Sequence, residues 1–247
     1  MQVSPPFGYK EIVPLNRTQK VRLLRPGEMP EFALNLNAIP LSYTEFAPAA
    51  REYPIVFTAP AGGREFAAVA VLGMTAGENL YNHGGDWAGG VYVPAYARRF
   101  PFCMARVSLD KVEQKNRLIC VEKSRIDEAA GEALFDAKGQ PADKWKDIEH
   151  LLTEYEADLE RSREMCAILS DYGLLETFTM QAKLAKGGEP MAMTGMHRVA
   201  EAKIEHLNAS QLKNLVKKGI LSRVYAHLLS LDNFGKLLDR KAARVAA

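Results

Sequence analysis

The residue types that could carry chemistry gather in one glycine-rich stretch and in the segment that follows it. Six of the eighteen glycines fall between Gly73 and Gly90. Because glycine allows positive φ angles and a close approach of the backbone to a ligand, this density is typical of a tightly turned structural loop or of a ligand-binding loop. The candidate ligand contacts here and just downstream are His83, Asp86, Trp87, Tyr96, Arg98 and Arg99.

His83 and Asp86 stand three residues apart, a spacing that suits a metal pair or an acid–base couple. Two ligands are too few for a metal site, and no His-x-His, Glu-x-x-His or Cys-x-x-Cys motif supplies the others. A turn closed by an Asx-type side-chain hydrogen bond is the simpler interpretation. We therefore predict no metal and no cofactor.

The sequence also lacks the familiar motifs of nucleotide binding and nucleophilic catalysis. No G-x-G occurs, so the dinucleotide fingerprint is absent, and no glycine precedes Lys-Ser or Lys-Thr at the spacing of a phosphate-binding loop. G-x-S-x-G is missing, and no cysteine has a local activating pattern. These absences make a catalytic role the less favoured interpretation.

Pro94 and Pro101 bracket a short helix that would carry Arg98 and Arg99 in its last turn. Cations there complement the helix macrodipole, so helix capping and surface charge are one interpretation. A clamp for an anion or a carboxylate is the other. Under the second interpretation, the segment Gly77–Arg99 forms a pocket for a small ligand.

The first half of the chain is predicted to be β-rich. Eight of the thirteen prolines lie in residues 1–54, which favours short extended pieces and turns over long helices. Residues 53–58 and 66–73 read as two strands joined by a glycine turn, and residues 102–108 and 117–121 read as a second pair.

A long amphipathic helix is predicted from Asp143 onward, because apolar residues recur at helical spacing. The apolar stripe consists of Trp145, Ile148, Leu152, Tyr155, Leu159, Cys166 and Leu169. Its other faces carry Asp147, Glu149, Glu154, Glu156, Asp158, Glu160 and Glu164. We interpret the acidic residues as a solvated face, with a docking face for a basic partner as the alternative.

A β-hairpin and two helices are predicted after this helix. Residues 177–184 and 191–199 flank a Gly-Gly and a proline that favour a chain reversal. Ser210 is the expected N-cap of the next helix, which ends at Gly219. A second helix follows at once and is expected to bury Leu221, Val224, Tyr225, Leu228 and Leu229.

The fold class is therefore α+β: an N-terminal β-rich region, one long amphipathic helix, a β-hairpin and C-terminal helices. Residues 1–142 form the β-rich region with the glycine-rich loop, and residues 143–247 form the rest. We expect the two to make one compact unit.

Charge and cysteine content narrow the partners and the compartment. The net charge is +2, but residues 124–164 hold 12 acidic and 6 basic side chains, and residues 195–247 hold 10 basic and 4 acidic. The basic residues are not interleaved with stacking aromatics, so we predict no nucleic-acid binding, and we favour contact between the two charged segments or self-association. Three scattered cysteines, no export signal and no apolar run long enough to span a bilayer predict a cytoplasmic protein without a membrane span. Surface association through an unrecognised export route is the alternative.

Several segments resemble the bacterial SapC family. G-E-N-L at residues 77–80, Trp87, and P-A-Y-A-R-R-F-P-F at residues 94–102 are similar to the family's G-E-N-L and P-A-x-x-R-R-[FY]-P-F elements. The likeness extends to residues 9–16, to residues 134–141 and to residues 226–231. The family takes its name from a protein associated with a bacterial paracrystalline surface layer, and the resemblance carries over no catalytic residues.

These observations lead to two functional hypotheses. The first is a non-enzymatic binding or assembly factor that works with surface-layer or cell-envelope proteins through a protein partner or self-association. The alternative is a small-ligand-binding protein or an enzyme whose pocket is formed by Gly77–Arg99.

Overall fold

The structure is a computed structural model, which describes residues 5–60, 63, 65–105, 108–109, 112–113, 117–182 and 191–246. The strands are β1 (Ile12–Pro14), β2 (Lys20–Val21), β3 (Ala38–Pro40), β4 (Ile55–Thr58), β5 (Ala67–Val71), β6 (Asn82–His83), β7 (Asp86–Trp87), β8 (Phe102–Ala105), β9 (Ser108–Leu109), β10 (Val112–Glu113), β11 (Leu118–Glu122), β12 (Glu132–Ala133), β13 (Leu175–Ala182) and β14 (Met191–Val199). The α-helices are α1 (Phe46–Ala49), α2 (Ala95–Arg98), α3 (Asp143–Asp171), α4 (Ala209–Lys217), α5 (Ile220–Ser230) and α6 (Asn233–Ala246). The α+β class is confirmed.

The described strands form five sheets, of which three are two-stranded pairs, β2–β12, β6–β7 and β9–β10. The two largest sheets are antiparallel, and both contain pairs predicted from the sequence. The larger sheet has the order β13-β14-β4-β5-β3, and the smaller has the order β1-β11-β8. The pairs β4–β5 and β8–β11 confirm the two predicted strand pairs. The predicted hairpin is present as β13–β14, and its turn lies outside the described residues.

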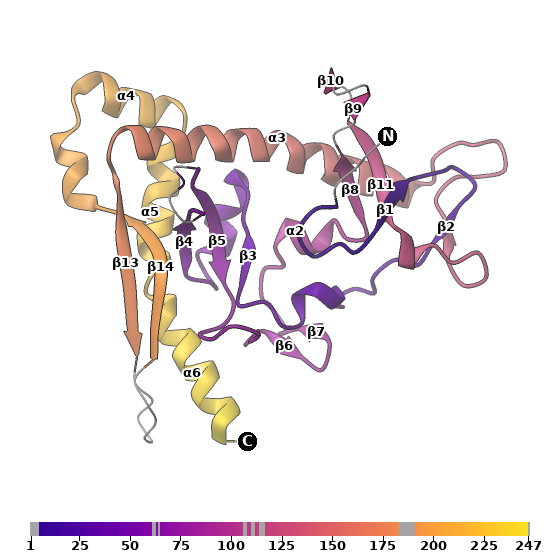
Figure 1. Cartoon of the computed structure of the whole chain (residues 1–247), viewed down its shortest axis with the longest axis horizontal. Coiled ribbons are helices and arrows are strands. Elements are labelled where there is room, and N and C mark those ends of the chain that lie inside the picture. The colour runs from indigo at the N-terminus through magenta and orange to yellow at the C-terminus, as the bar shows by residue number, and fades with distance from the viewer. Residues whose placement is uncertain are drawn as a thin grey trace.

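Helix α3 joins two separate clusters of buried side chains. Its first half places Trp145 and Leu152 in a cluster with Phe102 and Leu134, beside the smaller sheet. Its second half places Met165 and other apolar residues in the largest cluster, which also holds residues of the larger sheet. In Figure 1 the helix runs from one sheet to the other across the top of the view. A helix of 29 residues is long enough for this, at about 1.5 Å per residue.

The predicted apolar stripe of α3 is confirmed, but two of its acidic residues are not solvated. Asp158 is buried, accepts a hydrogen bond from the Thr44 hydroxyl and pairs with Arg161 at 2.9 Å. Glu156 is largely covered and pairs with Arg99 and Arg117. The expectation that both lie on a solvated face is therefore wrong. Arg161, the cation that pairs with Asp158, lies one turn away on α3. Thr44, Arg99 and Arg117 come from distant parts of the chain and leave no local signal.

The C-terminal helices differ from the expectation in three respects. Asn208, not Ser210, caps α4, through a capping box in which its side chain accepts from the Gln211 N–H. On α5, Ile220 and Val224 are buried, whereas Tyr225 and Leu229 are exposed. The face that meets the core is therefore rotated about the helix axis relative to the predicted face. Helix α6 was not predicted. Among the described residues, an ion pair between Lys218 and Glu164 at 2.5 Å joins the two charged segments.

The two ranges on either side of residue 142 contribute to the same largest cluster of buried side chains. The division into 1–142 and 143–247 stays a prediction.

All three cysteines are buried and free, and burial raises the pKa of Cys103 and Cys166 to about 12. Among the described helices, none is long and apolar enough to cross a membrane.

A buried histidine fastens α5 to the larger sheet. His227 lies with its Nδ1 2.8 Å from the Ile55 carbonyl oxygen, and its Nε2 accepts the Val199 N–H at 3.1 Å. These two partners fix the neutral tautomer with the proton on Nδ1. Burial lowers the pKa of His227 to about 4. Protonation would remove the acceptor and leave a charge in the core.

This arrangement predicts a pH-dependent stability. Because the folded-state pKa lies below the usual value of 6.5, His227 stabilises the fold above that value. The stabilisation is lost as the pH falls from 6.5 toward 4, at up to about 1.4 kcal/mol per pH unit. Urea unfolding of the wild type and of His227→Gln at several pH values between 7 and 4.5 measures the difference. We expect the difference in free energy of unfolding between the wild type and His227→Gln to become smaller as the pH falls. The control, exposed His150→Gln, should follow the wild type at every pH. A difference between the wild type and His227→Gln that does not change with pH would contradict this prediction.

Candidate ligand-binding groove

A proline–glycine turn forms one wall of the candidate site. Pro26 and Gly27 occupy the centre of a turn in which the Glu28 N–H donates to the Arg25 carbonyl oxygen at 3.0 Å. The φ angle of Gly27 is +84°, which is the conformation that a type II turn requires at this position. The Glu28 carboxylate accepts the Arg25 N–H at 2.9 Å and closes the turn a second time.

This turn packs against the hairpin formed by β6 and β7. The Trp87 N–H donates to the Gly27 carbonyl oxygen, and the Met29 N–H donates to the Gly85 carbonyl oxygen, both at 2.8 Å. The predicted side-chain-bonded turn is present within the hairpin, and Asn82 supplies its acceptor, at 2.9 Å from the Gly85 nitrogen. The glycine-rich segment therefore places Trp87 next to the Pro26–Gly27 turn.

Helix α2 forms the opposite wall, and a buried carboxylate fixes its first turn. Pro94 precedes the helix as predicted. The Ala95 N–H donates to the Glu45 carboxylate at 2.6 Å, and the hydroxyl of Tyr92 donates to the same oxygen at 3.0 Å. The backbone and hydroxyl of Ser42 each donate to the other oxygen at 2.8 Å. Glu45 thus holds the segment from Tyr92 to Ala95 against the core.

Arg98 is positioned by this segment. Its Nε donates to the Val93 carbonyl oxygen at 3.0 Å, and one terminal nitrogen donates to the Tyr92 hydroxyl at 3.1 Å. Its guanidinium carbon also lies 5.6 Å from the centre of the Tyr92 ring. Burial and the Glu45 carboxylate raise the pKa of Tyr92, which therefore remains protonated and continues to donate to Glu45. An exposed arginine with this many fixed contacts is partly ordered before any ligand arrives.

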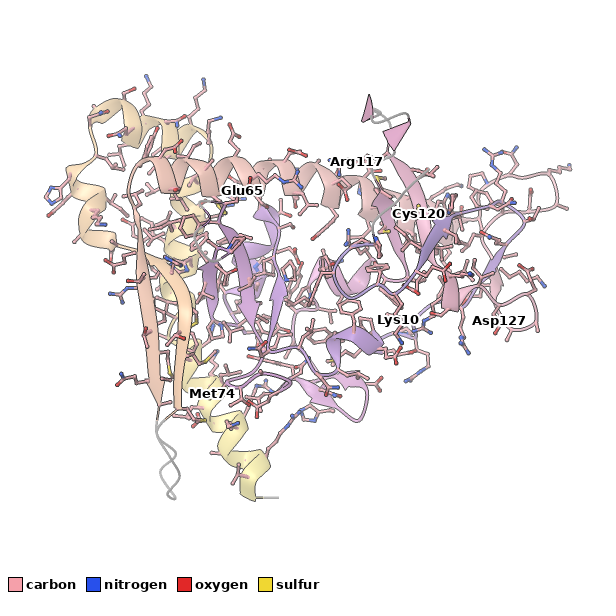
Figure 2. All side chains as sticks on the ribbon, viewed as in Figure 1. Lys10, Glu65, Met74, Arg117, Cys120 and Asp127 are labelled. Carbon is pink, nitrogen blue, oxygen red and sulfur yellow. The ribbon has the colours of Figure 1, made fainter. Side chains whose placement is uncertain are left out.

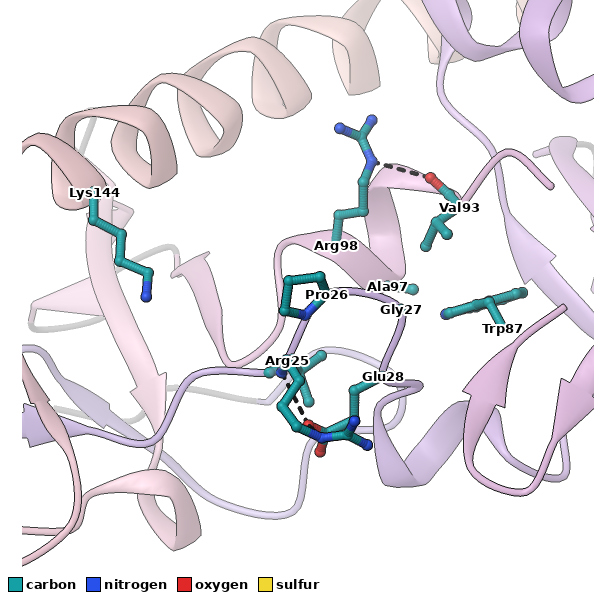
Figure 3. A pocket seen from close by; sticks show the side chains of 10 residues that line it. Arg25, Pro26, Gly27, Glu28, Trp87, Val93, Ala97, Arg98 and Lys144 are labelled. Atoms are coloured by element: carbon teal, nitrogen blue, oxygen red, sulfur yellow. Dashed lines mark hydrogen bonds and ion pairs between the residues drawn. The ribbon is translucent and has the colours of Figure 1, made fainter. Parts of the chain in front are cut away.

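A groove of about 380 Å³ lies between these walls and the first turn of α3 (Figure 3). Its volume falls in the range of about 300–1,000 Å³ that small-ligand sites occupy. A second cavity of about 200 Å³ adjoins it, and the two share Leu24, Arg98 and Lys144. The groove is lined by Leu24, Arg25, Pro26, Gly27, Glu28, Trp87, Val93, Ala97, Arg98 and Lys144.

Three cations and one carboxylate line the groove, and the cations differ in their pairing. Arg25 pairs with Asp86 at 3.1 Å and with Glu28 at 3.4 Å. Lys144 pairs with Glu132 at 2.6 Å. Within the part of the chain that the structure describes, the Arg98 guanidinium contacts only neutral acceptors. Arg98 is therefore the groove cation that has no carboxylate partner there.

Trp87 lines the groove, and its indole N–H is a hydrogen-bond donor without an acceptor among the described residues. Its side chain is 6% exposed, and its buried Nε1 has no acceptor among the described residues. A buried donor without an acceptor costs about 1–3 kcal/mol, so such groups are uncommon away from functional sites. Trp87 therefore supplies apolar surface to the groove and carries a buried N–H that no described residue accepts.

The structure brings only some of the six predicted site residues together. Trp87 and Arg98 line the groove, and Asp86 reaches it through its ion pair with Arg25. His83 is exposed at the turn of the β6–β7 hairpin. Tyr96 is buried, and its hydroxyl donates to the Phe7 carbonyl oxygen at 2.6 Å.

Arg99 lies in a box of aromatic rings, and the interpretation of it as a surface charge is wrong. It is 4% exposed, and its guanidinium carbon lies 4.3 Å from the ring centre of Tyr96, 4.8 Å from that of Tyr155 and 5.7 Å from that of Tyr9. Glu156 on α3 lies 3.8 Å away. Arg117 contacts the same carboxylate and can be followed beside α3 in Figure 2. Arg99 therefore clamps a carboxylate of its own chain and joins α2 to α3.

Sequence reasoning missed Arg25, Glu28 and Lys144. The tetrapeptide Arg25-Pro26-Gly27-Glu28 is a type II turn signal that could have identified the first wall. Nothing in the sequence places this turn beside Trp87 or Lys144, since the three are far apart along the chain. Among the described residues, no group of three or more His, Cys, Asp or Glu side chains could hold a metal ion.

Comparison with known proteins identifies the family. No curated protein and no solved structure matches the chain. The family model described as SapC matches residues 16–237, which include the groove and both of its walls. This match covers most of the chain and agrees with the resemblance found at residues 77–102. The chain belongs to the SapC family.

Proposed function

We propose that this SapC family member is a non-enzymatic binding protein whose groove holds an anionic, partly apolar group at Arg98. The observation that carries the proposal is the state of Arg98: its guanidinium is fixed by Val93 and Tyr92, and no carboxylate of the described chain neutralises it. A fixed guanidinium with free N–H groups suits carboxylate and phosphate oxygens.

The rest of the groove supports this choice of ligand. Leu24, Val93, Ala97 and Trp87 supply an apolar surface next to the cation. Arg25 and Lys144 add positive potential at the edges, which attracts an anion and raises its rate of association. A group with a carboxylate beside an aromatic or aliphatic part would satisfy both halves of the groove.

The family resemblance supports the wider setting of the proposal. In that setting the anionic group belongs to an acidic segment of a surface-layer or cell-envelope protein, which this protein binds in the cytoplasm. The alternative of a free small ligand uses the same groove and the same arginine. A protein partner and a free small ligand are distinguished by whether a peptide or a small carboxylate binds more tightly.

Thermal-shift measurements on the full chain test the proposal. The probes are matched pairs, phenylacetate against phenylacetamide and an acidic Phe-Glu peptide against its Phe-Gln counterpart. We expect the anionic member of a pair to raise the melting temperature, because a ligand that binds only the folded state stabilises it by mass action. A larger shift with the peptide favours a protein partner, and a larger shift with phenylacetate favours a small ligand.

The matched variants are Arg98→Gln and Arg51→Gln, the latter removing an exposed arginine outside the groove. Binding should vanish in the first and persist in the second. Equal shifts with charged and neutral probes, or an equal response of both variants, would overturn the proposal.

A further inference from the structure

Helix α5 carries apolar side chains that are not buried in the core. Ile220 and Val224 are buried, and His227 joins the same side to the larger sheet. The opposite side carries Leu221, Tyr225 and Leu229, spaced four residues apart so that they form one row along the helix. We call this row the α5 stripe.

Two of the three residues of the α5 stripe are exposed, and Leu221 is half-buried where it packs against the core. Tyr225 is 43% exposed, and Leu229 is 72% exposed, the highest value among the exposed large hydrophobic side chains of the described residues. Single exposed apolar residues are ordinary on protein surfaces, but a row on one helix face indicates an interaction surface. In Figure 1, α5 lies at the end of the molecule far from α2, so the stripe is separate from the groove.

The charges at the two ends of the α5 stripe are complementary to each other. Asp232 follows the C-terminal end of α5, and Lys217 precedes its N-terminal end. Both residues are exposed, and neither side chain has an ion pair within the described parts of the chain. If a second α5 lies antiparallel to the first, each Asp232 faces the Lys217 end of the other copy. It also meets the positive end of that copy's helix macrodipole.

We propose that the α5 stripe packs against the α5 stripe of a second copy of this chain, antiparallel and about a twofold axis. Such an interface is self-complementary in both apolar surface and charge, which is the requirement for a closed dimer. A helix of 11 residues covers less than the roughly 800 Å² per partner of a stable complex. The dimer is therefore weak and forms at micromolar or higher concentration.

Sedimentation velocity of the full chain, over a concentration series from low micromolar to several hundred micromolar, tests this proposal. The wild type should move from monomer toward dimer along the series. Leu229→Glu should remain monomeric, because in this register it places a carboxylate against Leu221 of the other copy, inside the apolar contact. Val245→Glu is the matched control: Val245 is 71% exposed and lies outside α5. It should dimerise like the wild type.

Charge exchange tests the antiparallel arrangement. Asp232→Lys and Lys217→Asp should each weaken the dimer about threefold to tenfold, in line with an exposed ion pair, and the double variant should recover the wild-type dissociation constant. A wild type that remains monomeric throughout the series would overturn the proposal. A dimer that Leu229→Glu leaves intact, or a double variant weaker than either single one, would overturn it as well.

Discussion

Replacing Arg99 by alanine should lower the free energy of unfolding by about 3–5 kcal/mol, because the change empties a buried space between three tyrosine rings and removes their contacts with the guanidinium. Replacing the adjacent Arg98 by alanine should lower it by only about 0.5–1 kcal/mol, the worth of exposed hydrogen bonds. The two residues have the same side chain and are neighbours at the C-terminal end of α2. They differ in what surrounds them: three tyrosine rings and Glu156 for Arg99, and solvent with two neutral acceptors for Arg98.

The large effect at Arg99 has two sources. Truncation removes the side chain that fills the space between Tyr9, Tyr96 and Tyr155, and leaves a cavity in the contact between α2 and α3. It also removes a desolvated cation from three aromatic faces, each contact being worth about 1–2 kcal/mol at such a site. Glu156 retains Arg117, so the carboxylate is not left wholly unpaired.

Urea and thermal unfolding of the two variants measure this contrast. At about 2–4 °C per kcal/mol for a chain of this size, Arg99→Ala should lower the melting temperature by about 6–20 °C. Arg99→Lys keeps the charge but loses the planar stacking, so it should fall between the wild type and Arg99→Ala. Equal decreases in the free energy of unfolding for Arg98→Ala and Arg99→Ala would show that the three tyrosine rings around Arg99 do not stabilise the fold.

Charge reversal at Arg98 should abolish the binding of anions in the groove. Arg98→Glu removes the fixed guanidinium and places a carboxylate beside the ligand's own charge. The loss of a charge-assisted bidentate contact and the added repulsion together cost about 3 kcal/mol or more, which is at least a hundredfold in dissociation constant. Isothermal titration with phenylacetate measures the effect.

Two further variants separate charge from position. Tyr92→Phe keeps the ring and removes the hydroxyl that accepts from Arg98 and donates to Glu45. It should weaken binding about threefold to tenfold by loosening the guanidinium, in line with the loss of one hydrogen bond. Arg51→Glu makes the same charge change outside the groove and should leave the affinity within twofold. A comparable loss in Arg51→Glu and Arg98→Glu would mean that only net charge matters.

Much of the fold could be predicted because its signals are local. The seven-residue apolar stripe of α3, the paired runs that become β4 and β5, and the two prolines around α2 each depend on residues close in sequence. The errors at the C-terminus have local causes too. On α5 the buried face includes the polar residues His227 and Ser230 beside Ile220 and Val224, so apolar periodicity could not select the face that meets the sheet.

The candidate site could be predicted only in part, because its other half is brought there by tertiary contacts. Trp87 and Arg98 lie within the glycine-rich segment and the short helix that the sequence singled out. Arg25 and Lys144 come from a turn and a helix whose positions depend on long-range hydrogen bonds, such as that from the Trp87 N–H to Gly27. The burial of Arg99 needed rings from positions 9 and 155, which no sequence spacing connects.

The indole N–H resonance of Trp87 tests the central claim, that the groove binds an anionic group beside Arg98, most directly. The chain has two tryptophans, so two indole signals are expected, and Trp87→Phe assigns them. On titration with phenylacetate, the account predicts a saturable shift of the Trp87 signal alone, with Trp145 as the internal reference. The shift should be absent with phenylacetamide and in Arg98→Gln. A Trp87 signal that stays in place with phenylacetate, or moves equally with the neutral amide, would contradict the account.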